Sequence, residues 1–316
     1  MISAQGLTRA FDGVVAVEGL SFSVPEGALF ALLGPNGAGK TTTVRLLMGL
    51  IGPSAGSATV AGYRVGSGSD AGSRLRRACG LLTEAPGFYE RMSAWDNLVF
   101  FGRLYGIPER TLAPQLEHYL RMLELWDRRT HLVGTFSKGM KQRLAIIRAL
   151  FHDPKVVFLD EPTAGLDPEA ALEVRELIAR LKTEGRTIVV CTHNLDEAER
   201  LADSVGILRR RLLVCDTLQR LRSGTDADGR VAVRIGLTEP AARYTPALIA
   251  QPPATGLSEV QATGAILSAR SPADAVPALV AWLVGRGAGI RQVETTADSL
   301  EAIYLRAVRG GGANGQ

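Results

Sequence analysis

The 316-residue sequence has few cysteines, few aromatic side chains and no long apolar run. Its three cysteines, Cys79, Cys191 and Cys215, show neither a pairing pattern nor metal-ligand spacing, which predicts buried thiols in a reducing compartment. The most apolar stretch, residues 276–284, is far shorter than the roughly 18–20 residues that cross a bilayer. The N-terminus also lacks the basic-then-apolar layout of a signal peptide. We therefore expect a soluble or peripheral, cytoplasmic protein.

The sequence also lacks a large excess of charge of one sign. Its 36 Lys and Arg residues against 32 Asp and Glu residues leave a net charge of only +4. Such mild basicity fits a protein near an anionic membrane face or on a partner, and it does not demand nucleic acid. The arginine clusters at residues 74–77 and 209–211 are most simply solvated faces. The length suggests two domains, or one large and one small.

What the sequence does contain is a phosphate-binding pattern. The apolar run 28–33 predicts a buried strand and residues 43–48 predict a helix. The loop between them matches G-x-x-x-x-G-K-[ST], in which backbone N–H groups and the helix N-terminus hold a polyphosphate. The loop residues are Gly34, Pro35, Asn36, Gly37, Ala38, Gly39, Lys40, Thr41 and Thr42. Lys40 is expected to reach the β- and γ-phosphates and Thr41 to bind Mg²⁺; a merely glycine-rich turn is the alternative.

Two carboxylates follow a second buried strand. The four apolar residues 156–159 predict a strand covered on both faces, and Asp160 and Glu161 stand at its C-terminal end. Ligands bind at this edge of open α/β sheets. We expect Asp160 to hold Mg²⁺ and Glu161 to act as the general base for water. The alternative is that the pair caps a helix or loop.

Three further positions lie where elements begin or end. Ser137 is predicted to cap a helix whose apolar face includes Leu144 and Ile147. Asp167 and Pro168 are predicted to cap and start the next helix. His193 follows the strand 187–191 at the same sheet edge, where a γ-phosphate could be contacted, although a lone histidine is more often structural.

The remaining pattern predicts an α/β fold, a P-loop NTPase core with antiparallel edge strands and an inserted helical subdomain, over residues 1–216. The edge strands are expected at 2–7 and 19–24, a central strand at 79–83 ending at Glu84, and a flexible loop at 66–72. Residues 85–135 are expected to form the helical subdomain, which begins at the capping box Ser93-x-x-Asp96.

From Thr217 onward the sequence predicts a small α+β domain over residues 217–309 and a disordered tail over residues 310–316. Residues 223–229 are expected to form a polar linker. Strands are expected at 231–237, 266–269 and 289–294, and helices at 218–221, 272–285 and 298–308. No chemical motif stands in this region, and its sequence leaves open a regulatory, dimer-stabilising, partner-contacting or simple packing role.

Together the motifs resemble the nucleotide-binding subunit of an ABC transporter. Five motifs occur in the family's order and spacing across about the first 215 residues: 34–42, 136–140, 156–161, 164–167 and His193. Within the family, residues 136–140 and 298–301 are most similar to ATPase subunits of drug- or antibiotic-efflux (ABC-2 type) exporters.

The resemblance implies ATP and Mg²⁺ as cofactors, a second ATPase subunit in a homodimer, and a separate integral membrane permease that exports a drug-like, antibiotic or lipid substrate. Phe11 would stack on adenine with Val17 beside it. Ser137 and Gly139 would contact the ATP of the second copy, with Asp167 at that interface. His193 would be the switch histidine. Residues 85–135 would grip the permease and hold the subunit at the inner face of the cell membrane.

Two departures from the family pattern stand out. Lys138 and Met140 replace the third and fifth residues of the usual Leu-Ser-Gly-Gly-Gln signature, while Ser137 and Gly139 are kept. Glu84 stands where a glutamine is usual; a carboxylate can still ligate Mg²⁺ but adds negative charge beside ATP.

Two other functions remain as alternatives. A soluble ABC-type ATPase acting on nucleic acid or ribosomes would tend to carry two cassettes, coiled-coil insertions or strongly basic linkers, and none is present. A nucleotide-binding regulator that does not hydrolyse would be expected to lack Lys40, Asp160 or Glu161, and all three are present. No nucleic-acid partner is expected.

Overall fold

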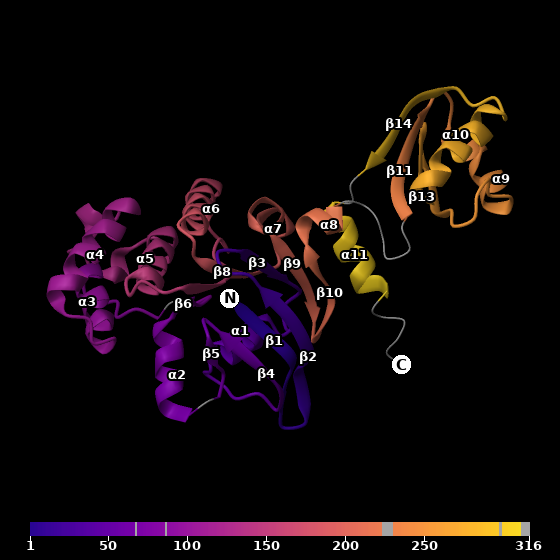
Figure 1. The fold of residues 1–316 in the computed structure, drawn as a ribbon. Coiled ribbons are helices and arrows are strands. Elements are labelled where there is room, and N and C mark those ends of the chain that lie inside the picture. Colours follow the sequence, from indigo (N-terminus) through magenta and orange to yellow (C-terminus); the bar gives the residue numbers. More distant parts are fainter. Residues whose placement is uncertain (67, 86, 223–229, 297–298, 311–316) are drawn as a thin grey trace. The chain divides into compact units, whose positions relative to one another are not determined.

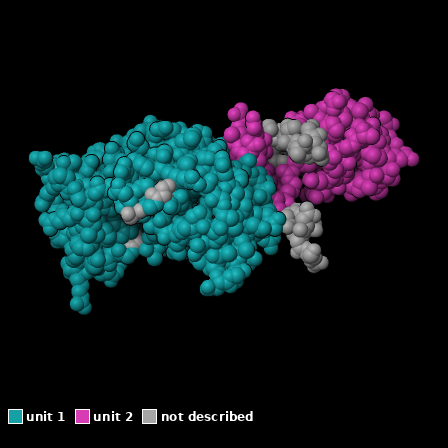
Figure 2. Space-filling model, turned by 60° about the horizontal axis from the view of Figure 1, so that its bottom comes forward, with its two compact units in different colours: residues 1–215 teal, residues 216–316 magenta. Residues whose placement is uncertain are grey.

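A computed structural model describes most of the chain, which forms two compact units, residues 1–215 and 216–316 (Figures 1 and 2). The described residues are 1–66, 68–85, 87–222, 230–296 and 299–310. The linker predicted at 223–229, residues 297–298 and residues 311–316 lie outside them. Of the disordered tail predicted at 310–316, Gly310 is described, and it is the last residue of a helix, so the prediction was wrong for this residue. Each unit is described by itself.

The first unit is built on a six-stranded sheet with the strand order β10-β9-β3-β8-β7-β6. The strands are β3 (Leu29–Leu33), β6 (Cys79–Leu82), β7 (Val156–Asp160), β8 (Thr187–Thr192), β9 (Ser204–Arg209) and β10 (Arg211–Thr217). From β9 to β6 the neighbours pair in parallel. Every residue of β3, β7 and β8 is buried, as expected of strands with both faces covered. This arrangement confirms the predicted P-loop α/β class.

One expectation for this sheet was wrong. The strand at Cys79 is not central, because β6 lies at the edge of the sheet. It is nevertheless buried because helix α5 (Lys138–Leu150) packs closely on it: a Cβ added to Gly80 would lie against the Ala149 carbonyl oxygen. The apolar residues of β6 are therefore explained by the helix that covers the strand, and not by neighbouring strands on both of its edges.

The two predicted N-terminal strands pair antiparallel as expected, but they belong to a second sheet of the order β2-β1-β4-β5, in which β1 is an interior strand. Its strands are β1 (Ile2–Phe11), β2 (Val14–Val24), β4 (Ala55–Val60) and β5 (Tyr63–Arg64). The β1–β2 hairpin is longer than predicted and turns through Asp12 and Gly13, both at positive φ. Helix α1 (Lys40–Leu47) buries Val44 and Leu46 in the core shared by the two sheets. The packing of this helix fixes the C-terminal end of the phosphate loop.

The predicted helical insertion contains α3 (Ala94–Leu104) and α4 (Glu109–Met122), followed by short 3-10 turns at Trp126–Arg128 and Val133–Thr135. Ser93 caps α3 by accepting from the backbone N–H of Asp96 at 3.0 Å. The subdomain shares one apolar core with α5 and α6 (Pro168–Thr183). Helix α7 (Leu195–Leu201) follows β8.

The flexible loop expected at residues 66–72 was wrong for its larger part, because Gly68–Arg77 form helix α2. Two interactions outweigh its glycines. Leu75 is fully buried against the core, and Arg74 pairs with Asp70 one turn earlier at 2.8 Å.

The second unit is an antiparallel sheet of the order β12-β13-β11-β14. Its strands are β11 (Arg230–Leu237), β12 (Ser258–Thr263), β13 (Ile266–Pro272) and β14 (Ile290–Thr296); its helices are α8 (Leu218–Arg222), α9 (Thr245–Ala250), α10 (Val276–Val284) and α11 (Leu300–Gly310), with 3-10 turns at Ala241–Arg243 and Ala273–Ala275. The order β11-α9-β12-β13-α10-β14 is the ferredoxin-like split βαβ arrangement. The prediction for this region omitted β12 and α9.

Candidate functional site

The phosphate loop connects β3 to α1 as predicted. Lys40 is only 6% exposed, and its Nζ donates to the Gly34 carbonyl oxygen at 2.7 Å. Gly39 adopts φ 105°, and a Cβ there would lie 2.5 Å from Val17 Cγ1. Glycine is therefore needed at this position both for its backbone angle and for its closeness to β2.

The loop borders a cavity of about 460 Å³. Most of the predicted loop and carboxylate residues line it, and they come from both sheets and from the ends of β7 and β8. The lining residues are Val14, Val15, Ala16, Pro35, Asn36, Gly37, Ala38, Gly39, Lys40, Thr41, Thr42, Glu84, Asp160, Glu161, Ala164, His193 and Arg210. The cavity is thus open to a ligand that meets backbone N–H groups, a lysine and carboxylates at once.

The structure separates the residues expected at adenine. Val17 is fully buried behind Gly39, so it supports the loop rather than facing the cavity. Its neighbours Val14, Val15 and Ala16 line the cavity instead. Phe11 is 41% exposed at the β1–β2 turn, with the Arg9 guanidinium 4.4 Å above its ring, and lies outside this cavity as the described residues define it.

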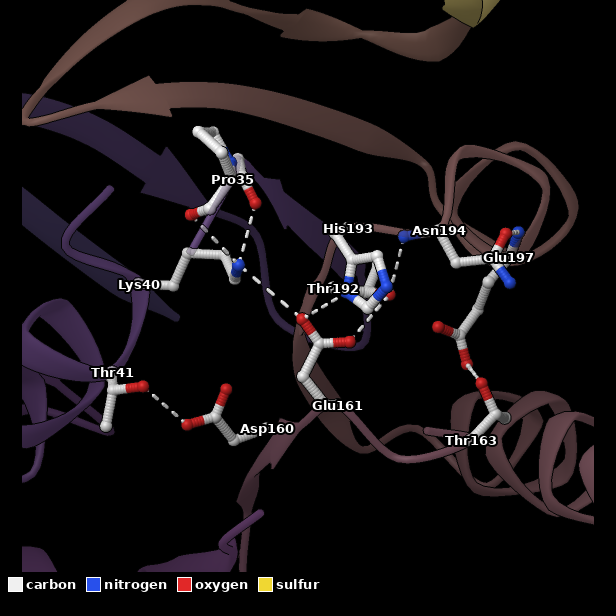
Figure 3. Close-up of polar contacts among 11 residues, drawn as sticks. Pro35, Lys40, Thr41, Asp160, Glu161, Thr163, Thr192, His193, Asn194 and Glu197 are labelled. Atoms are coloured by element: carbon white, nitrogen blue, oxygen red, sulfur yellow. Dashed lines mark hydrogen bonds and ion pairs between the residues drawn. The ribbon is translucent and has the colours of Figure 1, made fainter. Parts of the chain in front are cut away.

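Asp160 ends the buried strand β7 and accepts from the Thr41 hydroxyl at 2.8 Å (Figure 3). Burial raises the pKa of Asp160; the Thr41 hydrogen bond lowers it and the neighbouring Glu161 charge raises it again. Thr41, Asp160 and the cavity-lining Glu84 supply only oxygen donors, which are the ligands that Mg²⁺ prefers. The donor set at this corner of the cavity therefore fits the ion.

Glu161 is held on several sides. Its carboxylate lies 3.5 Å from Lys40 Nζ and 2.9 Å from His193 Nδ1, and Thr192 donates to its second oxygen at 3.4 Å (Figure 3). Its backbone takes φ 49°, rare for a non-glycine residue, while its N–H bonds the Cys191 carbonyl oxygen of β8. The carboxylate is thereby held in the lining of the cavity, beside Lys40 of the phosphate loop.

Ser137, Gly139 and Asp167 are not brought to this cavity. Ser137 caps α5 by accepting from the Met140 N–H at 3.2 Å, and Asp167 caps α6 by accepting from the Ala170 N–H at 2.9 Å. Lys138, which departs from the usual signature sequence, places its Nζ over Gly165, in the loop that leads to Asp167. These residues form a second group, separate from the one around Lys40.

Besides Val14, Val15 and Ala16, two sets of site residues were missed. Arg210 lines the cavity, and its N–H bonds the Ala38 carbonyl oxygen of the phosphate loop, whereas its arginine cluster was interpreted as a solvated face. The loop after Glu161 is held by Gln142 from α5 and by Glu197 from α7. Neither has a local sequence signal, because each contact joins residues at least 20 positions apart.

The parallel sheet, the glycine-rich loop at a helix start and the carboxylates at the neighbouring strand end define a P-loop NTPase. The ABC transporter family profile matches residues 17–164. The bacitracin transport ATP-binding protein BcrA of Bacillus licheniformis is 39% identical over 215 residues, 68% of each chain. The daunorubicin/doxorubicin resistance ATP-binding protein DrrA of Streptomyces peucetius is 36% identical over 223 residues, 70% of this chain and 67% of its own.

A solved structure of an ATP-binding subunit of an ABC transporter superposes with a TM-score of 0.64 at 33% identity, covering 71% of this chain and 92% of the other. The chain belongs to the ATP-binding proteins of ABC transporters, a family of ATPases. This chain matches 59–68% of the length of the eight curated relatives that were compared in detail. Among the described residues, no helix has the length and apolar character that a bilayer crossing needs.

Proposed function

We propose that the chain hydrolyses MgATP in a dimer with a second copy and thereby drives a separate membrane permease in the export of a drug-like, antibiotic or lipid substrate. The observation that carries this proposal is the position of Glu161. Its carboxylate lies between Lys40 and His193 at the edge of the phosphate-loop cavity, where a general base for hydrolysis is needed.

Each residue has a definable task in this reaction. The loop N–H groups and Lys40 bind the β- and γ-phosphates, and Glu161 accepts the proton of the attacking water. His193, hydrogen-bonded to Glu161 through Nδ1, orients that carboxylate, and as a lining residue of the cavity it would also contact the γ-phosphate. Thr41, Asp160 and Glu84 would hold Mg²⁺, which when bound neutralises charge that develops on the phosphates.

The second copy supplies what this cavity lacks. Ser137 is exposed and Gly139 is partly exposed at the start of α5, and neither lines the cavity of its own chain. In a head-to-tail dimer they contact the γ-phosphate held by the partner, with Asp167 at the same interface. Phe11, exposed at the end of its hairpin, stacks on adenine.

The permease binds to the helical subdomain. Tyr89, Phe100 and Leu104 expose apolar surface there, between 36% and 67% of each side chain. Tyr89 and Phe100 pack edge to face at 5.1 Å, so the patch has a defined shape. Binding to a permease places the subunit at the cytoplasmic face of the membrane. Relatives named for bacitracin transport, daunorubicin/doxorubicin resistance and Nod factor export support an export role.

ATP hydrolysis by the purified full chain tests the proposal. Glu161→Gln should lower kcat by roughly 100-fold or more while ATP binding persists, because it removes the base and keeps the side-chain shape. Glu26→Gln, an exposed substitution in the β2–β3 turn, is the matched control and should leave kcat unchanged. Hydrolysis by Glu161→Gln at the wild-type rate would contradict the assigned base. Stimulation by nucleic acid, with no permease co-purifying, would favour the alternative function.

A further inference from the structure

The loop that follows Glu161 is fastened at two successive residues. Gln142 Nε2, from the buried side of α5, donates to the Pro162 carbonyl oxygen at 2.7 Å. The Thr163 hydroxyl donates to Glu197 Oε1 at 3.1 Å (Figure 3). Because this loop continues directly to Asp167, its position sets both the base at its start and the helix cap at its end.

Glu197 is an unusual residue for this position. It lies in the first turn of α7 and is only 1% exposed, although carboxylates are seldom buried so fully. Burial raises its pKa, and the hydrogen bond from Thr163 opposes that shift. An apolar side chain would avoid the desolvation cost but could not accept from the Thr163 hydroxyl, so packing alone does not account for a buried oxygen acceptor here.

The contact with Thr163 completes a ring that starts and ends at Glu161. From Glu197 the ring passes through its N–H to the Asn194 side chain at 3.2 Å, and from the Asn194 N–H to the Thr192 hydroxyl at 3.0 Å. Thr192 then donates to the Glu161 carboxylate at 3.4 Å. Glu161 is thus restrained through its backbone by Thr163 and through its side chain by the segment that carries His193.

We propose that Glu197 is a positioning residue for ATP hydrolysis: through Thr163 it fixes the loop after Glu161 and couples that loop to the His193 segment. The inference rests on the proposed function. Glu197 lies outside the lining of the nucleotide cavity as the described residues define it, so it acts on the base and not on the nucleotide. Its loss should therefore lower kcat and leave the KM for ATP nearly unchanged.

The test compares variants that remove the contact with variants that keep it, in the full chain. Thr163→Val is nearly isosteric and removes the donor, and Glu197→Ala removes the acceptor. Thr163→Ser and Glu197→Gln retain a hydroxyl donor and an oxygen acceptor. We expect the first pair to lower kcat roughly five- to tenfold with KM changed less than about twofold, and the second pair to stay within about twofold of wild type.

The double variant Thr163→Val/Glu197→Ala should be no slower than the slower single variant, because both remove one contact. Wild-type kcat in Thr163→Val, whether or not its melting temperature falls, overturns the inference and leaves the proposed function standing. Equal losses in kcat for Thr163→Val and Thr163→Ser would also overturn it. A wild-type chain that hydrolyses no ATP overturns the proposed function and this inference together.

Discussion

The sheet that contains β3, β7 and β8 in the first unit and the sheet of the second unit are buried differently. In the first unit, β3, β7 and β8 are covered on both faces, and every residue in them is buried. In the second unit, β11 and β12 alternate between more and less buried positions, and the described residues of β14 are partly or largely exposed. The polar residues of the nucleotide site gather at the ends of the doubly covered strands. Because both faces of these strands are buried, only their ends can place polar side chains beside a ligand. A sheet with one open face can carry polar residues along its whole length.

The largest effect on stability should come from the doubly covered sheet. Phe158 in β7 is fully buried, and Phe158→Ala should reduce the free energy of unfolding of the first unit by about 3–5 kcal/mol. Urea unfolding followed by circular dichroism measures this. Leu172→Ala, at a 49% exposed position on α6, is the control and should change stability by no more than about 0.5 kcal/mol. Similar losses in the two variants would contradict the assigned core.

The second unit should show the same contrast within one sheet, at a smaller scale. Ile235 in β11 is 1% exposed, whereas Val293, its cross-strand partner in β14, is 41% exposed. Ile235→Ala should cost about 2–4 kcal/mol and Val293→Ala less than about 1 kcal/mol. Hydrogen exchange of peptides from residues 230–296 reports this unit separately. Equal loss of protection in both variants would mean that the edge strand β14 is covered as well as β11.

The sequence was most informative where a cause is local. Residues 156–159 predict a buried strand because four apolar residues in a row suit only a doubly covered sheet, and Ser137 and Asp167 predict caps because a cap bonds its own helix. The phosphate loop belongs to the same class. Its meaning depends on a strand before it and a helix after it, and both can be seen in the sequence.

The sequence was least informative where distant segments decide the outcome. The burial of the edge strand β6 depends on α5, and the contact of Glu197 depends on Thr163, 34 residues away. Arg210 lines the cavity, and its backbone N–H bonds the phosphate loop at Ala38. Helix α2 was missed because its glycines were weighed without the buried Leu75. These interactions appear only once the chain is folded.

The smallest expected effect is a difference in pH dependence between two glutamates, one in each unit. Burial raises the pKa of Glu197, whereas hydrogen bonds from Thr238 and Tyr244 lower the pKa of Glu239. A raised pKa means that Glu197 contributes stability below its unfolded-state pKa and that this contribution is lost as pH rises through the folded-state value. A lowered pKa means the reverse for Glu239, whose contribution is present above the unfolded-state pKa and is lost on acidification.

Glu197→Gln should therefore raise the urea midpoint of the first unit more at pH 8 than at pH 5, because the amide avoids a buried charge at the higher pH. Glu239→Gln should lower the midpoint of the second unit at pH 8 and matter less at pH 4, where the carboxylate begins to protonate. The two substitutions are chemically identical, so each serves as the control for the other. The same sign of pH dependence in both would show that the environments of these carboxylates do not differ as their burial and hydrogen bonds indicate.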